Sequence, residues 1–346
     1  MPTSLEPVPG TPFGLVATAD GRWSFVSMPN SRSVGVFRIG HPALPSLVRQ
    51  VATRAQLLGE ALTPGGRYLL AADDADGAVV INVSRAESGG AHALVGTLGS
   101  GSADGAIEVA VSPDGRFAFV SLEDSASIAV YNLQRGLAEG FSGPDLVGMI
   151  PVGIAPVGLA VSPDGRWLYA TSEVAAGGSA SGGQGTLSVI SLDRAETDPA
   201  ASVVSTVDAG CSPVRVITSA DGGVVWVTAR ESDRLLGFAA ARLRTDPARS
   251  LIASVEVGEA PVGLALADGG TRIVVADSNR FDAPNAASSL AVVSVPAALA
   301  GQPGLTGYLP AGGFPRQMAL EPDGETLLVT NFSSQQLEAV SVADLP

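Results

Sequence analysis

Two glutamates, Glu60 and Glu108, interrupt a repeated pattern of apolar segments and are the residues best suited to acid and base chemistry. At the position of Glu60, six related segments carry apolar residues: Leu15, Val109, Leu159, Val216, Leu264 and Met318. A carboxyl group at such a position is expected to be buried, and burial raises its pKa into the range that a general acid or base needs. The alternative interpretation is a structural ion pair with a nearby arginine such as Arg54.

Glu108, Arg215 and Gln317 share the neighbouring position of the repeat, and Arg316 stands beside the last of them. The other four copies have glycine there: Gly14, Gly59, Gly158 and Gly263. Converging polar side chains of these types suit a carboxylate or a polar, polyfunctional ligand, because arginine offers a bidentate fork. A structural salt bridge between Glu108 and Arg215 is the alternative.

Further polar residues follow the second strand of the repeats and are expected to bind substrate at the rim of the same face: Asp73, Glu123, Glu173, Arg230, Asp277 and Asn331. An oxygen-rich rim of this kind suits Ca²⁺ or Mg²⁺, so a divalent cation is an open alternative. No ligand spacing in the sequence matches a known metal loop, and we therefore expect no cofactor and assign no metal ligand. Ordinary solvated acids of surface loops are the other account of these residues.

The elements that position these residues come from a sevenfold repeat. Its strongest copy, PVGLAVSPDGRWLYATS, runs from Pro156 to Ser172. The turn glycines of the copies are about 45 to 57 residues apart: Gly21, Gly66, Gly115, Gly165, Gly222, Gly270 and Gly324. Each copy predicts a β-hairpin around its turn, followed by two more strands. The chain 1–346 is therefore predicted to be one all-β domain, a seven-bladed β-propeller of four-stranded antiparallel blades.

The two ends of the chain predict how the ring closes. The last repeat stops after its third strand, QLEAVSV, from Gln336 to Val342. The segment from Ser4 to Gly10 matches the fourth strands of the other repeats. We expect this N-terminal strand to complete the last blade.

Composition excludes several classes of function. The 346 residues include 20 arginines, no lysine and 34 acidic residues, giving a net charge of -14. Nucleic acid and acidic membranes are therefore not expected as partners, because both need a basic surface. The sequence shows no signal peptide and no long apolar run, and its single cysteine cannot form an internal disulfide. We expect a cytoplasmic protein, monomeric, with a small molecule as its main ligand and a protein partner as a further option.

The repeats resemble those of the YVTN-repeat, lactonase-like seven-bladed propellers. The resemblance spans almost the entire chain and is carried by the segment Pro156 to Ser172 and by LLVTN at Leu327 to Asn331. It implies the propeller fold, and functions that range from lactone hydrolysis to binding. Lactonase-like enzymes are expected to place histidine after the proline of an inner strand. That position here holds Phe13, Leu58, Ile107, Val157, Val214, Val262 and Arg316.

The two histidines, His41 and His92, lie in segments that lead to outer strands, so ordinary lactonase chemistry is not supported. The sequence instead favours an enzyme of lactonase-like fold, acting at the channel mouth on a small polar or anionic carbonyl or lactone-type metabolite. Glu60 or Glu108 would supply acid and base chemistry for a hydrolase, an isomerase or a cyclase. A loop from Ser278 to Ser289, carrying Arg280 and Phe281, is placed to order over a ligand. The alternative function is a non-catalytic propeller that binds a protein or a ligand.

Overall fold

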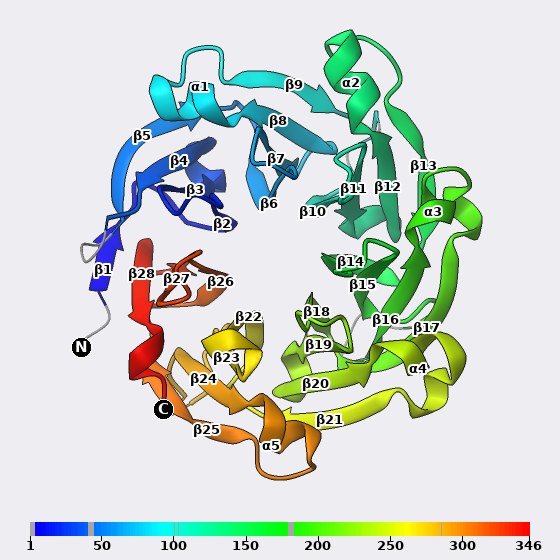
Figure 1. Cartoon of the computed structure of the whole chain (residues 1–346), viewed down its shortest axis with the longest axis vertical. Helices are drawn as coiled ribbons and strands as arrows, with labels where there is room; N and C mark the ends of the chain where they lie inside the picture. Colours follow the sequence, from blue (N-terminus) through cyan, green and yellow to red (C-terminus); the bar gives the residue numbers. More distant parts are fainter. Residues whose placement is uncertain (1–3, 41–44, 100, 103, 179–182, 285) are drawn as a thin grey trace.

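Seven four-stranded antiparallel sheets form a ring around a central channel in the computed structural model (Figure 1). The structure describes residues 4–40, 45–99, 101–102, 104–178, 183–284 and 286–346. The predicted seven-bladed β-propeller is thereby confirmed. In blades 1 to 6 the chain passes from an inner strand at the channel to an outer strand at the rim, as Figure 1 shows.

The strands of the first four blades are given in chain order. Blade 1 holds β2 (Leu15–Ala17), β3 (Trp23–Met28), β4 (Ser33–Arg38) and β5 (Ser46–Ala52). Blade 2 holds β6 (Leu57–Leu62), β7 (Tyr68–Asp73), β8 (Ala78–Asn82) and β9 (Leu94–Leu98). Blade 3 holds β10 (Ala106–Val111), β11 (Phe117–Leu122), β12 (Ser127–Asn132) and β13 (Leu146–Pro151). Blade 4 holds β14 (Ile154–Val161), β15 (Trp167–Val174), β16 (Gln184–Ser191) and β17 (Val203–Cys211).

The remaining three blades follow the same order until the ring closes. Blade 5 holds β18 (Pro213–Thr218), β19 (Val224–Ala229), β20 (Arg234–Ala239) and β21 (Leu251–Glu256). Blade 6 holds β22 (Pro261–Ala267), β23 (Arg272–Asp277), β24 (Ser289–Ser294) and β25 (Leu305–Pro310). Blade 7 holds β26 (Pro315–Leu320), β27 (Thr326–Asn331), β28 (Gln336–Ser341) and β1 (Ser4–Pro7).

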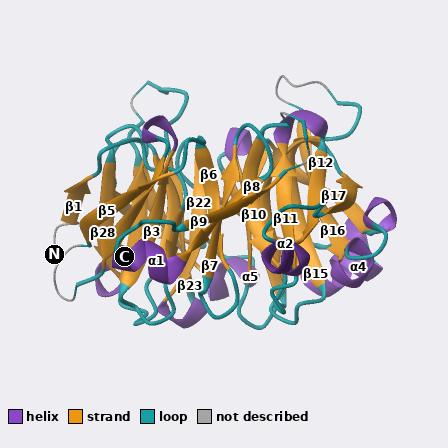
Figure 2. Ribbon diagram, turned by 90° about the horizontal axis from the view of Figure 1, so that it is seen from above, coloured by secondary structure: helices purple, strands orange, loops and turns teal. Residues whose placement is uncertain are grey.

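Short helices follow the third strand of five blades: α1 (Val83–Ser88), α2 (Leu133–Glu139), α3 (Leu192–Ala195), α4 (Ala240–Thr245) and α5 (Val295–Leu299). Seven 3₁₀ turns complete the described elements: η1 (Pro29–Ser31), η2 (Glu123–Ser125), η3 (Pro199–Ala201), η4 (Arg230–Ser232), η5 (Pro247–Arg249), η6 (Asp268–Gly270) and η7 (Val342–Asp344). Figure 2 shows α1, α2, α4 and α5 toward one face of the ring. Within the residues described, no helix is long and apolar enough to cross a membrane.

The hairpin turns form because a short polar motif satisfies its own backbone. In the turn of blade 4, the Ser162 hydroxyl donates to Asp164 Oδ1 (2.5 Å), and that oxygen accepts the Arg166 N–H (3.1 Å). Gly165 takes a φ of +68°, which glycine adopts without strain. The same hydroxyl–carboxylate pair recurs at Ser112 and Asp114.

The core consists of apolar clusters between neighbouring blades rather than one central core. At the junction of blades 7 and 1, for example, Leu328 and Leu337 pack with Val26 and Phe37. Comparable clusters fill the other six junctions. Each blade is therefore stabilised by both of its neighbours, because its apolar side chains are buried only when the adjacent blades pack against them.

A β-bulge near the start of the inner strands determines which side chains point into the channel. In blade 5 the register shifts between Pro213 and Arg215, and the Arg215 N–H is bound by the Thr228 hydroxyl (3.2 Å). Thr228 in turn donates to the Val262 carbonyl of blade 6 (2.7 Å). The bulge turns two consecutive residues, Val214 and Arg215, toward the same cavity.

The N-terminal strand completes the last blade, which confirms the predicted closure. Strand β1 pairs antiparallel with β28, with Leu5 opposite Glu338. Beyond the strand, the Val8 N–H donates to the Gln335 carbonyl (2.9 Å), and its side chain is buried between blades 7 and 1. Figure 1 shows β1 beside β28, so both ends of the chain share one blade.

Deleting residues 1–9 is expected to lower the melting temperature by at least about 5 °C, because the edge of β28 and the buried pocket of Val8 become exposed. Thermal unfolding followed by circular dichroism measures this. Deleting residues 1–3 alone leaves β1 whole and serves as the control. Equal melting of the longer deletion and the full chain would contradict closure by β1.

Candidate functional site

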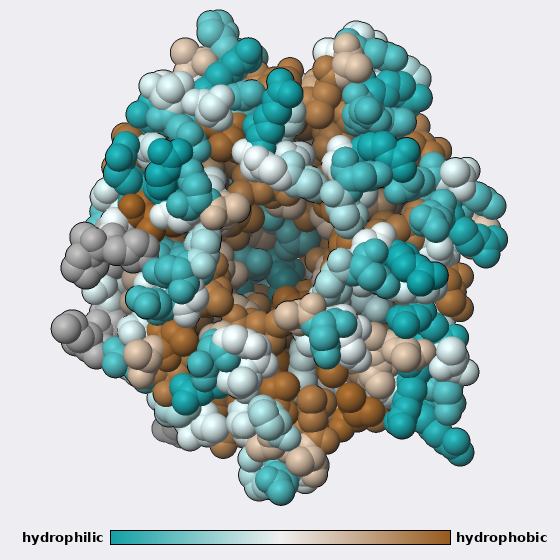
Figure 3. Space-filling view, viewed as in Figure 1, coloured by the Kyte–Doolittle hydropathy of each residue, from teal (hydrophilic) through white to brown (hydrophobic). Residues whose placement is uncertain are grey.

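A cavity of about 300 Å³ occupies one mouth of the central channel. Figure 3 shows a hollow at the centre of the ring, with hydrophobic walls and hydrophilic residues within it. The walls include an apolar belt, defined here as Ile107, Val157, Val214, Val262 and Phe314. Apolar walls with a few convergent polar groups are typical of small-molecule sites.

Around the cavity, the rim carries a fixed ion pair between blades 4 and 5. Arg230 opens η4, and its Nη2 lies 2.7 Å from Glu173 Oε2 and 2.8 Å from Ser212 Oγ. The Ser212 hydroxyl also donates to Glu173 Oε2 (3.1 Å). Because Arg230 is almost fully buried, this three-membered cluster holds it in place and neutralises its charge.

Two further rim residues point into the cavity without such partners. Glu123, which opens η2 of blade 3, and Arg280, in the loop after β23, both line the cavity. Burial, followed by the neighbouring Glu173, raises the pKa of Glu123. Burial and Arg230 lower the pKa of Arg280. Each side chain thus has hydrogen-bonding capacity directed at the cavity.

The most unusual group is Arg316, which takes the place of an apolar residue on the inner strand of blade 7. Its guanidinium lies 3.5 Å from the centre of the Phe13 ring, with Phe314 and Phe332 within 6 Å. Its Nε is buried without a hydrogen-bond partner among the described residues. Desolvation, followed by repulsion from Arg215, Arg280 and Arg230, lowers the pKa of Arg316 well below its ordinary value.

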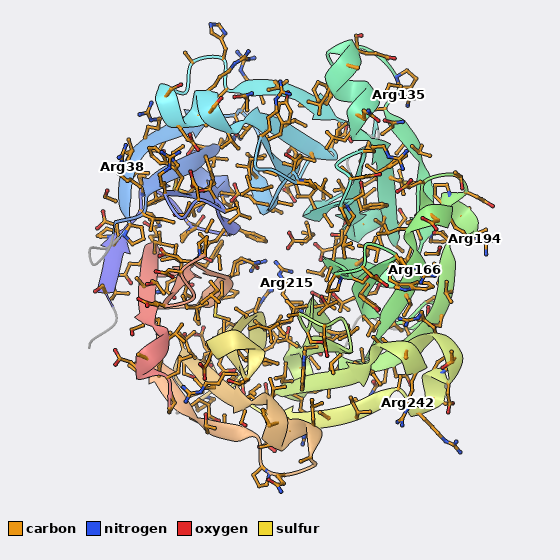
Figure 4. All side chains as sticks on the ribbon, viewed as in Figure 1. Arg38, Arg135, Arg166, Arg194, Arg215 and Arg242 are labelled. Atoms are coloured by element: carbon orange, nitrogen blue, oxygen red, sulfur yellow. The ribbon has the colours of Figure 1, made fainter. Side chains whose placement is uncertain are left out.

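Glu108, Arg215 and Gln317 meet across the channel beside the cavity, from blades 3, 5 and 7. Arg215 Nη2 lies 3.6 Å from Glu108 Oε2, and its Nε donates to Gln317 Oε1 (3.3 Å). Figure 4 shows Arg215 at the centre of the ring, whereas Arg38, Arg135, Arg194 and Arg242 lie toward its outside. We call these three residues the channel plug.

Glycine in the intervening blades makes room for the plug. A Cβ atom on Gly59 would lie only 2.3 Å from Glu108 Oε1. Burial raises the pKa of Glu108, while Arg215 opposes that effect. The salt bridge that the sequence offered as an alternative for this pair is therefore present, and Arg215 belongs to the cavity wall as well.

Glu60 lies apart from the cavity and packs against Gly14 of blade 1. A Cβ atom added to Gly14 would lie 3.1 Å from the Glu60 Cγ. Glu60 forms no ion pair in the described part of the chain, and Arg54 instead lines a separate surface groove. Desolvation raises the pKa of Glu60 well above its ordinary value; a backbone hydrogen bond from Ser27 opposes the rise, and Glu108 adds to it. Glu60 is thus a buried acid whose surroundings favour its protonated form.

Three other residues predicted from the sequence lie away from the cavity. Asp73 lines the same surface groove as Arg54. Asn331 is fully buried and donates to Glu338 Oε2 (2.7 Å). Asp277 is fully buried, accepts the Ser289 hydroxyl (3.1 Å), and has its pKa raised to about 8 by desolvation.

The sequence assigned no role to the aromatic residues around Arg316. Phe13, Phe314 and Phe332 come from the start of blade 1 and from both ends of the hairpin of blade 7. A signal for them existed, since Phe13 and Arg316 hold equivalent positions in adjacent blades. His92 is exposed, and His41 lies outside the described residues. No cluster of three or more potential metal ligands occurs within the described ranges.

Replacing Glu60 with leucine is expected to stabilise the protein by about 1 to 2 kcal/mol at pH 7, because a buried carboxyl without an ion pair is replaced by the residue found in blades 1, 4 and 6. The gain should shrink toward pH 4, where the unfolded chain also protonates Glu60. Urea unfolding at both pH values measures this. The Glu60→Gln variant is the control for shape, and a destabilised leucine variant at pH 7 would contradict the interpretation of Glu60 as a buried acid without an ion pair.

Asp277→Asn tests a second buried acid. In wild type, the folded state keeps the Asp277 proton up to a pH of about 8, whereas the unfolded state releases it near 3.8. Stability therefore falls as pH rises through this window, and it should fall less in the asparagine variant. Unfolding free energies measured between these pH values give the slope. Parallel slopes for the two proteins would show that Asp277 is ionised in the folded state.

Comparison with known proteins supports the fold alone. No protein-family model matches the sequence, and no curated protein matches it. A chain of Kuenenia stuttgartiensis hydrazine synthase superimposes with a TM-score of 0.76 at 17% identity, covering 96% of both chains. A chain of the mitotic checkpoint complex gives 0.73 at 13% identity, covering 99% of this chain and 94% of the other. A functionally unknown protein from Desulfotomaculum acetoxidans gives 0.67 at 13%, covering 87% and 86%. The chain is similar in fold to both enzyme and checkpoint-complex components.

Proposed function

We propose that the protein binds a small anionic carbonyl metabolite in the channel cavity and acts on it with acid and base chemistry. The observation that carries this proposal is Arg316. Its guanidinium is held by aromatic rings, faces three other arginines and has no carboxylate within hydrogen-bond distance among the residues described. A desolvated cation of this kind is costly without a counter-charge, and a bound anion supplies one.

The shape of the cavity supports a small metabolite over a large one. Its volume of about 300 Å³ is at the lower end of the range for ligand pockets. Water occupies about 30 Å³ per molecule, so the cavity holds on the order of ten non-hydrogen atoms. The apolar belt surrounds this space and favours a ligand that carries hydrocarbon as well as charge.

Glu108 is the best candidate for acid and base chemistry. Burial raises its pKa, which brings a carboxyl group closer to the neutral range where general acids and bases work. Arg215 lies between Glu108 and Gln317 and also lines the cavity, so it is placed to orient a substrate carbonyl. The lactonase-like resemblance of the repeats supports the fold and not a histidine-based site, so hydrolysis, isomerisation and cyclisation through Glu108 all remain within this proposal.

Binding without turnover is the second candidate function. Glu108 is engaged by Arg215 and is not part of the cavity wall, and no histidine lines the cavity within the described part. A propeller with this site would recognise a ligand, or an acidic side chain of a protein partner, through Arg316 alone. Loss of turnover in Glu108→Gln, with affinity retained, would favour the enzyme over this alternative.

The Arg316→Met variant tests the anion site. Its affinity for small carboxylates is expected to fall about tenfold to a hundredfold, because charge-assisted hydrogen bonds are lost. Isothermal titration calorimetry with short carboxylates, keto acids and lactones measures this. Arg249→Met, at a highly exposed arginine, removes the same charge and is the control. The variant should melt no lower than wild type, and unchanged affinity in a folded variant would overturn the proposal.

A further inference from the structure

The cavity carries unpartnered polar groups on opposite sides of the ring. Arg316 enters from blade 7, and Glu123 enters from blade 3, which lies across the channel (Figure 1). The belt residues between them, Ile107, Val157, Val214 and Val262, come from blades 3 to 6 in succession. A ligand that satisfies both polar groups therefore has two polar ends and an apolar middle.

The charges around the cavity favour a ligand with one negative charge. Four guanidiniums face the site from Arg215, Arg230, Arg280 and Arg316. Three carboxyl groups, from Glu108, Glu123 and Glu173, oppose them. One positive charge is thus left over when all the groups are ionised. A monoanion neutralises it, whereas a dianion leaves an excess of negative charge in a poorly solvated site.

The environment of Glu123 determines the other end of the ligand. Its carboxylate has no hydrogen bond to a described residue and lies close enough to Arg230 and Arg280 to be affected by both. An ammonium group would be repelled by those two guanidiniums, and a second carboxylate would be repelled by Glu123. A neutral hydroxyl avoids both penalties, since it donates to Glu123 and accepts from Arg280.

On the basis of the anion-binding function proposed above, we propose that the ligand is a short hydroxy carboxylic acid. Its carboxylate binds Arg316 of blade 7, its apolar chain lies against the belt, and its hydroxyl binds Glu123 of blade 3 together with the Arg280 guanidinium, which comes from the loop after β23 of blade 6. Glu123 is then the residue that determines specificity, and Arg316 the residue that provides affinity.

The test compares pairs of ligands that differ only in one terminal hydroxyl. Calorimetry measures straight-chain carboxylates from butanoate to octanoate, the matching terminal hydroxy acids, and the matching amino acids and dicarboxylates. In wild type, the best hydroxy acid is expected to bind about tenfold more tightly than its parent, since a charge-assisted hydrogen bond contributes about 1.4 kcal/mol or more. Glu123→Ala should abolish this advantage while the parent carboxylate binds as before.

Matched variants separate specificity from stability. Asp124→Ala removes a neighbouring exposed acid of the same turn and should keep the full hydroxyl advantage. Glu123→Gln retains an acceptor oxygen without charge and should keep about a threefold advantage, and it replaces the alanine variant if that one fails to fold. Arg316→Met should weaken the hydroxy acid and its parent equally.

The outcomes distinguish this inference from the function on which it rests. If no carboxylate binds wild type, the proposed anion-binding function fails and the ligand class fails with it. If carboxylates bind through Arg316 but the hydroxyl adds nothing, only the ligand class is overturned. The same holds if amino acids or dicarboxylates bind more tightly than hydroxy acids, or if Glu123→Ala keeps the hydroxyl advantage.

Discussion

The rest of the structure depends on one pair of hydrogen bonds. A Ser or Thr hydroxyl on the second strand of a blade binds the backbone at the inner-strand bulge and a backbone carbonyl of the next blade. In blade 1 the Ser27 hydroxyl accepts the Gly14 N–H (2.7 Å) and donates to the Leu58 carbonyl of blade 2 (2.5 Å). Ser121, Thr228 and Thr330 make the same link to the next blade. One side chain thus satisfies the backbone of the bulge and joins two blades, at a place where an unpaired amide would be costly. Thr330 donates to the Phe13 carbonyl, so the link also crosses the junction where the ring closes.

This bulge explains why two consecutive residues of an inner strand supply both the apolar wall of the cavity and a member of the channel plug. In a regular strand, consecutive side chains point to opposite faces, and only one of Val214 and Arg215 would reach the cavity. Because the bulge changes the register there, both do. Polar side chains at the position of Arg215 can meet across the channel only where the equivalent residue of a neighbouring blade is glycine, because a side chain there would fill the space. Gly59 leaves this space for Glu108. The spacing of Glu108, Arg215 and Gln317 on alternate blades is thus a packing requirement as well as a chemical one.

The fold could be predicted from the sequence almost entirely, because turn chemistry and strand alternation are local and repeat seven times. The plug could be predicted for the same reason, since Glu108, Arg215 and Gln317 break an otherwise regular position. The rim could not. Asp73, Asp277 and Asn331 all end second strands, as the alignment indicates. Their side chains are nevertheless held by polar groups of the next strand or loop, which differ from blade to blade. Ser289 binds Asp277 and Glu338 binds Asn331, so both are held within their blades and away from the channel.

Arg316 is a charged residue at a position where the other six blades are apolar. Six blades place Phe13, Leu58, Ile107, Val157, Val214 or Val262 at its position, and each of them except Leu58 lines the cavity with an apolar side chain. Any of these would spare the seventh blade the cost of a poorly solvated guanidinium. The Phe13 ring offsets part of that cost, since a cation over an aromatic face gains about 2 kcal/mol when desolvated. Repulsion from Arg215, Arg280 and Arg230 works in the other direction. A charge at a position where the other blades are apolar supports the anion site that we propose, because active and binding sites are where folds retain such costs.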